Sequence, residues 1–318
     1  MAAAGERPPL CPVVVGPTAV GKTGLVTALA ARSPIEVISL DSRQVYRGLR
    51  IGTAQPTAAE QAACPHHLVD FLPPEETYSA QRFREDFTRA WSQIVARGRV
   101  PVLAGGAGFY LRAVTEGLLA LPADAEQRLP AVRQEVAALP PAELDAELAR
   151  VDRATHDRLH PNDRYRRQRA LEIFRLTGRS QSAITAGQAP DPAGGLEFAV
   201  VRLERPATEL DPRIAARTAQ MLASGWLEET TALCREHDPA CPGLRSLGYA
   251  EVVQHLAGRL PGAELAPAIV RTTRQYAKRQ RTWFRGLDAI TAGSPDDPGV
   301  LAAAAALVAD AQRRLAGA

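Results

Sequence analysis

The stretch VVVGPTAVGKTG, residues 13–24, predicts a strand, a glycine-containing loop and a helix in direct succession. Three β-branched valines precede the loop, and the helix-compatible segment LVTALAA follows it. The loop matches the pattern G-x-x-x-x-G-K-[ST] at Gly16, Gly21, Lys22 and Thr23. Glycines allow successive backbone N–H groups to converge on an anion, and the helix start adds the positive end of its dipole. The stretch therefore predicts a phosphate-binding loop.

Lys22 and Thr23 are the side chains of this loop that carry chemistry. The Lys22 ammonium group supplies a positive charge for a phosphate, and the Thr23 hydroxyl can bind Mg²⁺. The alternative is a chance glycine-rich turn, and the flanking strand and helix argue against it. The pattern indicates a diphosphate or triphosphate ligand, but it does not identify the reaction.

The composition is that of a folded globular protein. The chain has 318 residues, of which 46% are hydrophobic and 23% are charged. The longest apolar run, residues 300–309, is shorter than the roughly 20 residues that a membrane helix needs. The start, MAAAGERPPL, lacks the basic and apolar regions of a secretory signal. We therefore expect a cytoplasmic protein that does not enter a membrane.

Cysteine content and net charge exclude little. The cysteines are widely spaced and have no partner at a zinc-ligand spacing, so we expect reduced, structural thiols at Cys11, Cys64, Cys234 and Cys241. A net charge of +3 is mildly basic and alone gives no argument for a nucleic-acid partner. The distribution of the basic residues matters more than their sum.

Strand-like and helical patterns alternate over residues 10–120, which is typical of a parallel sheet with helices on both faces. Strand signals stop near Leu121, and residues 124–178 have the pattern of several proline-punctuated helices. Strands are expected at 11–15, 35–41, 99–106 and, after the helical stretch, 196–204. Later helices are expected at 211–224 and 267–285.

These patterns predict an α/β protein, a P-loop NTPase-like parallel sheet flanked by helices with an all-helical insertion domain. The P-loop-type catalytic core is expected to comprise residues 9–120 and 196–290, and the insertion residues 121–195. Residues 291–318 are expected to form a C-terminal helix that begins with Asp297 as N-cap and Pro298 at the first position.

Asp41 follows the second predicted strand. Because ligands in such sheets bind beyond the carboxyl ends of the strands, Asp41 and the phosphate-binding loop should face one crevice. The carboxylate could hold Mg²⁺ through water or act as a general base, and aspartate is also common as a helix or turn cap. Its position beside the loop favours a chemical role.

Two further segments border the same edge. The strand at 99–106 ends in glycines rather than in an acidic residue, which leaves room for a bulky acceptor. The segment CPHHLVDF contains His66, His67 and Asp70, which could suggest a metal site. Adjacent residues of an extended segment point in opposite directions, so we expect an ordering or packing role instead.

Two basic clusters favour RNA as a partner. In the first, PNDRYRRQRALEIFRLTG, Asn162 is a candidate cap and Gly178 a candidate helix end, and the arginines are Arg164, Arg166, Arg167 and Arg169. In the second, no acidic residue occurs between Glu264 and Asp288, and aromatic residues lie among Arg271, Arg274, Lys278, Arg279, Arg281 and Arg285. Most charge runs are solvated helix faces, but unbalanced basic residues mixed with aromatics suit a phosphodiester backbone with unstacked bases.

Taken together, these residues resemble the tRNA dimethylallyltransferases, which transfer an isopentenyl-type group to an adenine beside the anticodon. The matching stretches keep family order over residues 16–286: GPTAVGKT, SLDSRQVYRGLRIGTAQP, HHLVD, YSAQRFREDF, GGAGFYLRAVTEGL, NDRYRRQRALEIFRLTG, LDPRIAARTAQMLASG, SLGYAEV and TRQYAKRQRTWFRG. Coverage of nearly the whole chain makes a chance match implausible.

The resemblance implies that the loop binds the diphosphate of dimethylallyl diphosphate together with Mg²⁺, which Thr23 contacts. The implied diphosphate-binding residues are Gly16, Pro17, Thr18, Ala19, Val20, Gly21, Lys22 and Thr23, with Arg213 and Arg217 as further candidates that the sequence does not distinguish. Asp41 is implied to be the base that takes a proton from the exocyclic amine of adenine. Lys22 and Thr23 would neutralise the leaving diphosphate.

The resemblance also implies that the target adenosine is turned out of the anticodon loop. Ser42, Arg43 and Gln44 would read neighbouring bases or hold the flipped one. The insertion would bind the anticodon stem-loop, and the implied tRNA contacts are Asp41, Ala107, Arg128, Tyr165, Arg166, Arg167, Gln168 and Arg169, with Arg274, Lys278 and Arg281 from the second basic cluster. We expect a monomer.

The chain departs from the family pattern at Ala107, where a threonine is usual, and at Gln55, where a lysine is usual. Three other functions are alternatives. An adenylate isopentenyltransferase would not need the insertion or the basic 271–285 helix. A P-loop kinase that uses ATP leaves HHLVD and GGAGFY unexplained. A non-catalytic RNA-binding protein would not need an intact Lys22, Thr23 and Asp41.

Overall fold

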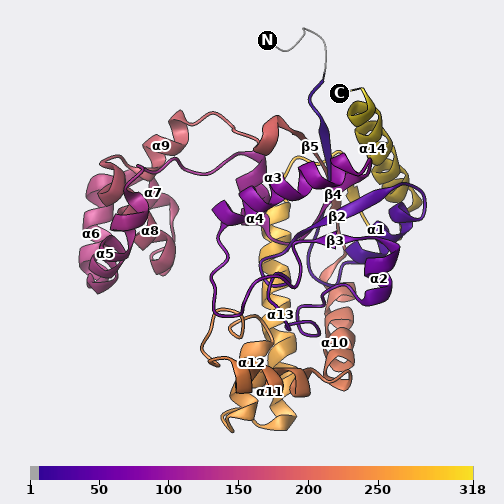
Figure 1. The fold of residues 1–318 in the computed structure, drawn as a ribbon. Coiled ribbons are helices and arrows are strands. Elements are labelled where there is room, and N and C mark those ends of the chain that lie inside the picture. Colours follow the sequence, from indigo (N-terminus) through magenta and orange to yellow (C-terminus); the bar gives the residue numbers. More distant parts are fainter. Residues whose placement is uncertain (1–6, 318) are drawn as a thin grey trace. The chain divides into compact units, whose positions relative to one another are not determined.

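The computed structural model describes residues 7–317, which form two compact units. One unit contains the described residues up to Thr115 together with those from Pro192 onward, and the other is Glu116–Asp191. The sequence predicted an insertion at residues 121–195, so each boundary of the observed unit lies a few residues earlier than predicted. Figure 1 follows the chain through both units.

A single parallel sheet forms the centre of the first unit, which confirms the predicted α/β fold class. Its strand order is β3-β2-β4-β1-β5-β6, and every neighbouring pair is parallel. The strands are β1 Leu10–Val15, β2 Ile35–Leu40, β3 His66–His67, β4 Val100–Gly105, β5 Glu197–Leu203 and β6 Thr291–Gly293. The short strands β3 and β6 were not predicted, because two or three residues give no periodic signal.

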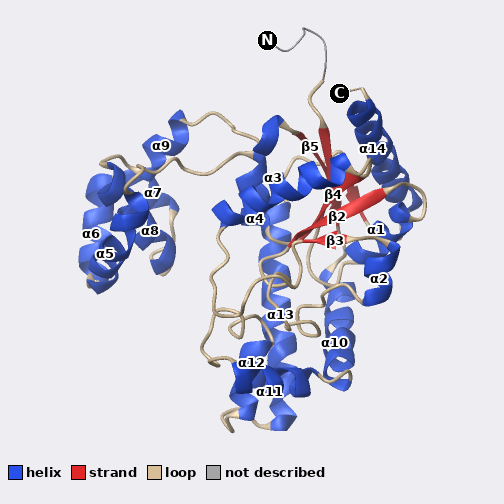
Figure 2. Ribbon diagram, viewed as in Figure 1, coloured by secondary structure: helices blue, strands red, loops and turns tan. Residues whose placement is uncertain are grey.

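Helices cover both faces of this sheet, as Figures 1 and 2 show. The helices of this unit are α1 Lys22–Ala30, α2 Ala58–Ala63, α3 Ala80–Ala96, α4 Gly108–Thr115, α10 Ala207–Ala223, α11 Trp226–Glu236, α12 Tyr249–Leu256, α13 Gly262–Phe284 and α14 Pro298–Ala316. Apolar residues of α1 and α14 pack with those of the strands in one buried cluster. On α3, the ring of Phe87 contacts that of Phe198 in β5, with a centroid distance of 5.9 Å.

The register of the sheet brings three loops to one edge. Val15 pairs with Gly105, and Leu40 pairs with the same glycine, so β1, β2 and β4 end side by side. A Cβ atom on Gly105 would lie 2.1 Å from the Leu40 carbonyl oxygen, so only glycine fits there. The phosphate loop (residues 16–23), the loop that starts at Asp41 and the turn that starts at Gly106 therefore meet beyond the sheet.

The C-terminal segment is part of the core and not only a helix. Residues 291–293 form β6, which pairs with β5 before α14 begins. The predicted cap is confirmed: the Asp297 side chain accepts a hydrogen bond from the Gly299 N–H, and Pro298 is the first helical residue. Burial of the larger aliphatic side chains of α14, Val300, Leu307 and Val308, contributes about 1.5–3 kcal/mol each to folding.

Two helix starts were predicted too late. Helix α10 begins at Ala207 and α13 at Gly262, whereas the sequence indicated starts at residues 211 and 267. Pro212 and Pro267 lie inside these helices, one turn after their actual starts. Proline is disfavoured in helix interiors, so these two positions weaken the local sequence signal for a helix.

The second unit is helical and has a hydrophobic core of its own. Its helices are α5 Ala125–Ala138, α6 Pro141–Val151, α7 Arg153–Arg158, α8 Arg164–Thr177 and α9 Gln181–Gly187. The core cluster is formed by buried residues of α5, α6 and α8, among them Val136, Leu144 and Leu171. The unit begins and ends at adjacent points, because the Asp191 N–H donates to the Glu116 carbonyl oxygen at 3.0 Å.

The predicted ends of α8 are half right. Gly178 ends the helix with a φ of 68°, a left-handed conformation that glycine adopts at little cost. The N-cap is Asp163 and not Asn162: the Asp163 carboxylate accepts from the Arg166 N–H at 3.2 Å. The Asn162 N–H instead donates to His160 Nδ1, so Asn162 belongs to the preceding turn.

Candidate functional site

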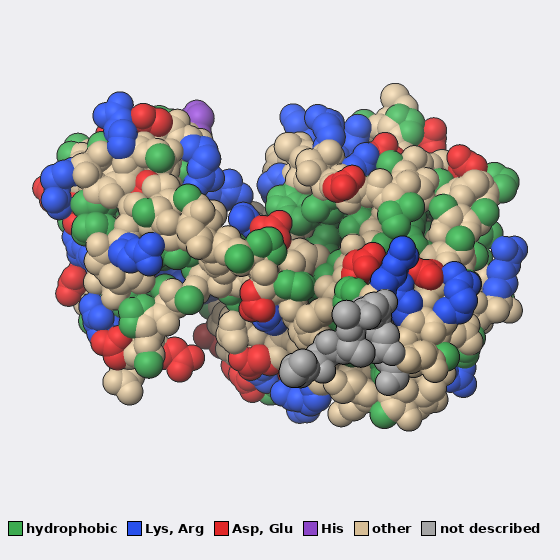
Figure 3. All heavy atoms as spheres, turned by 90° about the horizontal axis from the view of Figure 1, so that it is seen from above, with side chains coloured by type: hydrophobic (Ala, Val, Ile, Leu, Met, Phe, Trp, Pro, Cys, Tyr) green, Lys and Arg blue, Asp and Glu red, His purple; other side chains and the backbone are tan. Residues whose placement is uncertain are grey.

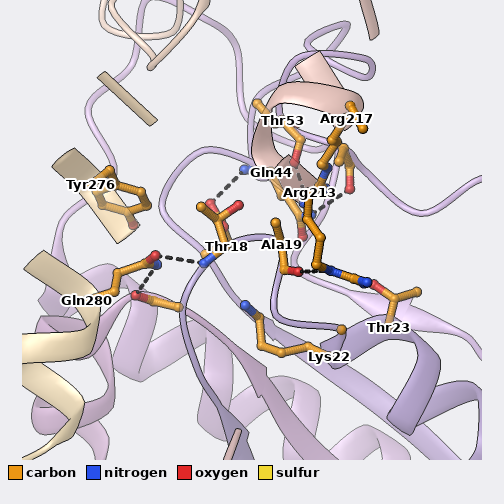
Figure 4. Close-up of a pocket in the computed structure, with 15 residues that line it drawn as sticks. Thr18, Ala19, Lys22, Thr23, Gln44, Thr53, Arg213, Arg217, Tyr276 and Gln280 are labelled. Atoms are coloured by element: carbon orange, nitrogen blue, oxygen red, sulfur yellow. Dashed lines mark hydrogen bonds between the residues drawn. The ribbon is translucent and has the colours of Figure 1, made fainter. Parts of the chain in front are cut away.

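A cavity of about 450 Å³ opens beyond the carboxyl ends of β1, β2 and β4 (Figure 4). Its wall comes from the phosphate loop, the loops after β2 and β4, and one face each of α10 and α13. The lining residues are Thr18, Ala19, Gly21, Lys22, Thr23, Asp41, Gln44, Thr53, Ala54, Gly106, Arg213, Ala216, Arg217, Tyr276 and Gln280.

Many of the residues selected from the sequence meet in this cavity. Those that line it are Thr18, Ala19, Gly21, Lys22, Thr23, Asp41, Gln44, Arg213 and Arg217. The remaining candidates of this unit lie outside the lining: Gly16, Pro17, Val20, Ser42, Arg43, Ala107, Arg274, Lys278 and Arg281. The cavity therefore combines three cationic side chains with one carboxylate.

Lys22 is held against the phosphate loop. Its Nζ atom donates to the carbonyl oxygens of Gly16 and Pro17, both at 2.9 Å. Burial lowers the pKa of Lys22 to about 8, the nearby Asp41 carboxylate opposes this shift, and the Arg217 guanidinium adds to it. An anion in the cavity would favour the protonated amine and raise this pKa again.

The backbone of the phosphate loop presents N–H groups to the cavity. Gly21 precedes α1 with a φ of 115° and provides no side-chain cap, so the first N–H groups of the helix are open to a ligand. Two other loop amides are bonded within the protein: Thr18 N–H donates to Gln280 Oε1, and Val20 N–H donates to the Pro17 carbonyl oxygen. The anion site therefore centres on the start of α1.

Asp41 is oriented by its own loop. Its Oδ1 atom accepts hydrogen bonds from the backbone N–H groups of Arg43 at 2.7 Å and Gln44 at 3.3 Å. Both bonds use the same oxygen, which leaves Oδ2 for a bound group. A carboxylate fixed in this way can accept a proton without first reorganising.

The Gln44 side chain is hydrogen-bonded within the cavity wall. Its Oε1 atom accepts from the Ser39 hydroxyl at 2.8 Å, and its Nε2 atom donates to the carbonyl oxygens of Thr53 and Ala54. These bonds engage both ends of the side-chain amide, so Gln44 stabilises the cavity wall, and its contact with a base stays a prediction. Arg43 is exposed, and its guanidinium donates to the Pro242 carbonyl oxygen at 3.4 Å.

The wall segment that contains Thr53 is anchored by α11 and α12. The Glu229 carboxylate accepts from the backbone N–H groups of Arg50 and Ile51, at 3.1 Å and 3.0 Å. The hydroxyl of Tyr249 donates to Glu229 and accepts from the Gly52 N–H at 3.0 Å. Tyr249 is fully buried, so this clamp holds three successive amides of the wall in one geometry.

The two arginines of α10 are distinguished by their contacts. Arg213 Nε donates to the carbonyl oxygen of Ala19 at 2.9 Å, which ties α10 to the phosphate loop. Arg217 lies one helical turn further along α10, where its exposed side chain lines the cavity. Desolvation by the surrounding protein lowers the pKa of Arg217, and the Asp41 carboxylate opposes this shift. Both guanidinium groups face the cavity, as Figure 4 shows.

Sequence reasoning missed Gln280 and assigned Tyr276 to RNA binding rather than to this cavity. Both belong to α13, whose basic and aromatic residues were interpreted as an RNA-binding surface. Their spacing of i and i+4 puts them on one helix face, a signal that the sequence did contain. Burial raises the pKa of Tyr276, and the Asp41 carboxylate raises it further. Helix α13 therefore forms part of the cavity and does not only present cations to solvent.

A smaller recess of about 70 Å³ adjoins the cavity. It shares Thr18, Ala19, Thr53 and Arg217 with the larger space. The rest of its wall is largely apolar and is formed by Gly52, Ile214, Thr218, Met221, Trp226, Leu247, Ile269 and Thr273. An anionic head at the phosphate loop and a short apolar tail would fit these two spaces together.

Of the two deviations noted in the sequence, Gln55 acts through its side chain, whereas Ala107 contributes a backbone bond that any residue with an N–H would make. The Ala107 N–H donates to the Leu40 carbonyl oxygen at 3.1 Å, which closes the turn after β4. The Gln55 side-chain amide donates to the carbonyl oxygens of Gln44 and Tyr46, at 2.9 Å and 2.8 Å. Gln55 therefore stabilises the loop that carries Asp41.

The insertion presents fewer free basic groups than expected. Arg167 is only 3% exposed, and its guanidinium binds Asp145 and the Leu159 carbonyl oxygen, which removes it from the expected RNA surface. Arg128 donates to the carbonyl oxygens of Arg175 and Leu176 at the end of α8.

Other candidates in the insertion do reach solvent. Tyr165 is 77% exposed, and the adjacent Arg166 is also exposed. Gln168 is half-buried, and Arg169 pairs with Glu172 at 2.8 Å. Figure 3 shows Lys and Arg side chains spread over the visible face of this unit, with acidic side chains among them. An RNA contact here would therefore rest on a few residues around Tyr165.

The second basic cluster is likewise mixed. Arg274 pairs with Asp211 at 3.3 Å, whereas Lys278 is exposed and Arg281 is half-buried.

The cysteines are free thiols, as predicted. His67 Nε2 bonds to Glu36 at 2.7 Å, and His66 Nδ1 contacts the Cys64 carbonyl oxygen. Over residues 7–317, no helix combines the length and apolar character needed to cross a membrane.

Most of the chain matches known protein families. A family model described as IPP transferase matches residues 44–287, and one described as isopentenyl transferase matches residues 11–68. A tRNA dimethylallyltransferase of Burkholderia thailandensis is 45% identical over 292 residues, which cover 90% of each chain. One from Synechococcus is 42% identical over 278 residues, which cover 87% of this chain and 80% of the relative.

Solved structures agree with these matches. The full-length tRNA isopentenylpyrophosphate transferase of Bacillus halodurans superposes with a TM-score of 0.68 and 33% identity, covering 98% of this chain and 99% of that one. A eukaryotic dimethylallyltransferase, studied crystallographically as it acts on tRNA, gives a TM-score of 0.76 with 27% identity, covering 90% of this chain and 74% of that one.

Proposed function

The chain belongs to the IPP transferase family of tRNA dimethylallyltransferases, and on this basis we propose that it transfers the dimethylallyl group of dimethylallyl diphosphate to an adenosine of tRNA. The acceptor is the exocyclic amine of an adenosine next to the anticodon. The observation that carries the proposal is the combination, in one cavity, of a cationic anion site and the separately oriented carboxylate of Asp41.

The chemistry that this cavity supports is a displacement at carbon. The adenine nitrogen attacks C1 of the dimethylallyl group, the C1–O bond breaks, and diphosphate leaves with the electron pair. Asp41 takes the proton that the amine loses, through Oδ2. Lys22, Arg217 and the first N–H groups of α1 stabilise the charge that develops on the diphosphate.

Mg²⁺ fits the residues present, as an ion carried mainly by the diphosphate. The Thr23 hydroxyl lines the cavity, and Mg²⁺ typically takes one or two protein oxygens and completes its shell with phosphate oxygens and water. Bound there, the ion would supply positive charge to the leaving group. Asp41 remains assigned to the proton rather than to the metal.

The apolar recess beside the phosphate loop suits the five-carbon chain. Its volume of about 70 Å³ and its wall of aliphatic and indole groups favour a short branched hydrocarbon over a further polar group. The larger cavity then receives the flipped adenine. In this arrangement the donor occupies the phosphate loop and the recess, and the acceptor base occupies the rest of the larger cavity.

The proposed macromolecular partner is the anticodon stem-loop of tRNA. Support comes from the tRNA-acting relatives and from the exposed Tyr165 and Arg166, since aromatic rings and guanidinium planes stack on unpaired bases. Lys278 adds an exposed cation on α13. We further propose that the enzyme works as a cytoplasmic monomer.

An acceptor-competition assay tests this function. Labelled dimethylallyl diphosphate and Mg²⁺ are incubated with the protein and with unmodified tRNA, AMP, or a mixture of small alcohols with ATP. We expect label in tRNA alone. Transfer to AMP would point to an adenylate isopentenyltransferase, and phosphate transfer from ATP labelled in its γ-phosphate would point to a kinase.

Asp41→Asn tests the proposed base. This variant keeps the shape of the side chain and its acceptor for the Arg43 N–H, but it cannot take up the amine proton. We expect turnover to fall by at least about a hundredfold, with tRNA binding unchanged. Asp288→Asn is the control, because it makes the same substitution at an exposed aspartate outside the cavity lining. Near-normal turnover of Asp41→Asn would refute the assignment.

A further inference from the structure

Gln280 links the two sides of the cavity through its side-chain amide. Oε1 accepts from the Thr18 N–H at 2.8 Å, and Nε2 donates to the Gly106 carbonyl oxygen at 2.9 Å (Figure 4). The partners fix the orientation of the amide, because Thr18 offers only a donor and Gly106 only an acceptor at these atoms. One side chain thus joins α13, the phosphate loop and the end of β4.

The surroundings of this amide are tightly constrained. Gln280 is 6% exposed, so both of its polar atoms need partners inside the protein. A Cβ atom on Gly106 would lie 2.2 Å from Nε2, so the backbone after β4 approaches the amide as closely as glycine permits. A carboxylate or an apolar side chain could not reproduce both bonds at neutral pH.

The contact with Thr18 affects the anion site directly. Thr18 lies between Gly16, at the end of β1, and Gly21, at the start of α1. Its N–H points to Gln280 and is therefore not one of the groups that face a diphosphate. Fixing this residue sets the path of the loop, and with it the direction of the amides that follow.

We propose that Gln280 is a positioning residue of the diphosphate site, which holds the phosphate loop at Thr18 against the end of β4 so that the start of α1 faces the ligand. This inference rests on the proposed function, because it takes the loop to bind diphosphate. It assigns α13 a second role beside the exposed cations that the sequence emphasised.

The test uses the full chain and inorganic diphosphate with Mg²⁺ as the probe. Gln280→Met removes both hydrogen bonds at nearly constant volume. Gln275→Met makes the same substitution at an exposed glutamine of the same helix. Calorimetry should show a Kd for diphosphate about tenfold weaker in Gln280→Met, the equivalent of one or two net hydrogen bonds, and unchanged in Gln275→Met. The KM for dimethylallyl diphosphate should rise in parallel, with the KM for tRNA unchanged.

A second variant separates positioning from a general loss of stability. Gln280→Glu keeps an acceptor for the Thr18 N–H, but it can donate to Gly106 only when protonated, and burial raises the pKa of such a carboxyl. The ratio of its diphosphate Kd to that of the wild type should therefore fall as the pH is lowered from about 8 to about 5.5. A merely structural role would lower the melting temperature and leave this ratio flat.

The outcomes distinguish this inference from the function on which it rests. If the wild type does not bind diphosphate, the proposed donor site is wrong. If the wild type binds diphosphate and folded Gln280→Met binds it equally well, the positioning role is refuted while the donor site stands. A weaker Kd together with the pH-dependent ratio of Gln280→Glu supports the inference.

Discussion

At the scale of single residues, the cavity depends on how each charge is held. Lys22 is bonded to two carbonyl oxygens of its own loop, Arg213 is tied to Ala19, and Asp41 is fixed through one of its two oxygens. The charged groups thus keep their positions through backbone contacts. Such preorganisation lets them stabilise developing charge without rearranging during the reaction.

Diphosphate affinity should depend on pH through Lys22. Its pKa of about 8 in the free protein lies below the ordinary value for lysine, so the amine loses its proton as the pH rises through 8. Bound diphosphate favours the protonated form, so binding above this pH requires uptake of a proton. Affinity should therefore fall above pH 8, by up to about tenfold per pH unit.

Calorimetric titrations with diphosphate between about pH 7 and pH 9.5 would measure this fall. Lys22→Arg is the matched control, because a guanidinium stays protonated throughout this range and reports only the titration of diphosphate itself. The same slope in both proteins would show that Lys22 does not change its charge on binding.

At the scale of secondary-structure elements, the helices between β5 and β6 shape the active edge of the sheet. Helix α10 contributes the two cavity arginines, α13 contributes Tyr276 and Gln280, and α11 and α12 clamp the wall at Gly52. The ring of Trp226 packs so closely on Gly52 that a Cβ atom there would lie 2.2 Å from it. The wall is therefore closely packed at Gly52, where only glycine fits.

Tyr249→Phe tests the clamp. The change removes the hydroxyl that bonds Glu229 and the Gly52 N–H and leaves both partners short of a bond inside the protein. We expect the free energy of unfolding to fall by about 1–3 kcal/mol in urea denaturation. We also expect a higher KM for dimethylallyl diphosphate. Tyr165→Phe, at an exposed position, is the control for stability. Equal stability of the two variants would contradict the role of the clamp.

At the scale of the whole molecule, the division into two units separates two tasks. The unit with the sheet contains every residue of the cavity, and Glu116–Asp191 has a core of its own. The backbone bond between Asp191 and Glu116 closes this second unit at its base. A unit with its own core and adjacent ends is a typical inserted domain.

Excision of the second unit tests this separation. A short Gly-Ser linker between Glu116 and Asp191 can replace the residues between them. The linker does not stretch the chain, because these two residues already share a hydrogen bond. The shortened protein should fold and bind inorganic diphosphate like the full chain. Its affinity for tRNA should fall by at least about tenfold, measured by filter binding at fixed salt. Undiminished tRNA affinity would show that the insertion is not the RNA-binding part.

The sequence by itself determined the local patterns. The strand, loop and helix around Gly16 and Gly21, the carboxylate at the end of β2 and the cap of α14 depend on neighbouring residues, and they were predicted. The parallel sheet followed from the order of these patterns. Strands of two or three residues escaped prediction because they owe their conformation to pairing with a neighbour.

Only the tertiary structure decided how the side chains are used. It brings Gln280 to a loop amide 262 residues away in the sequence, engages the Gln44 amide inside the wall and buries Arg167 in the insertion. The reason is physical: backbone conformation depends largely on residues a few positions away, whereas burial and hydrogen bonding of a side chain depend on whichever elements pack around it.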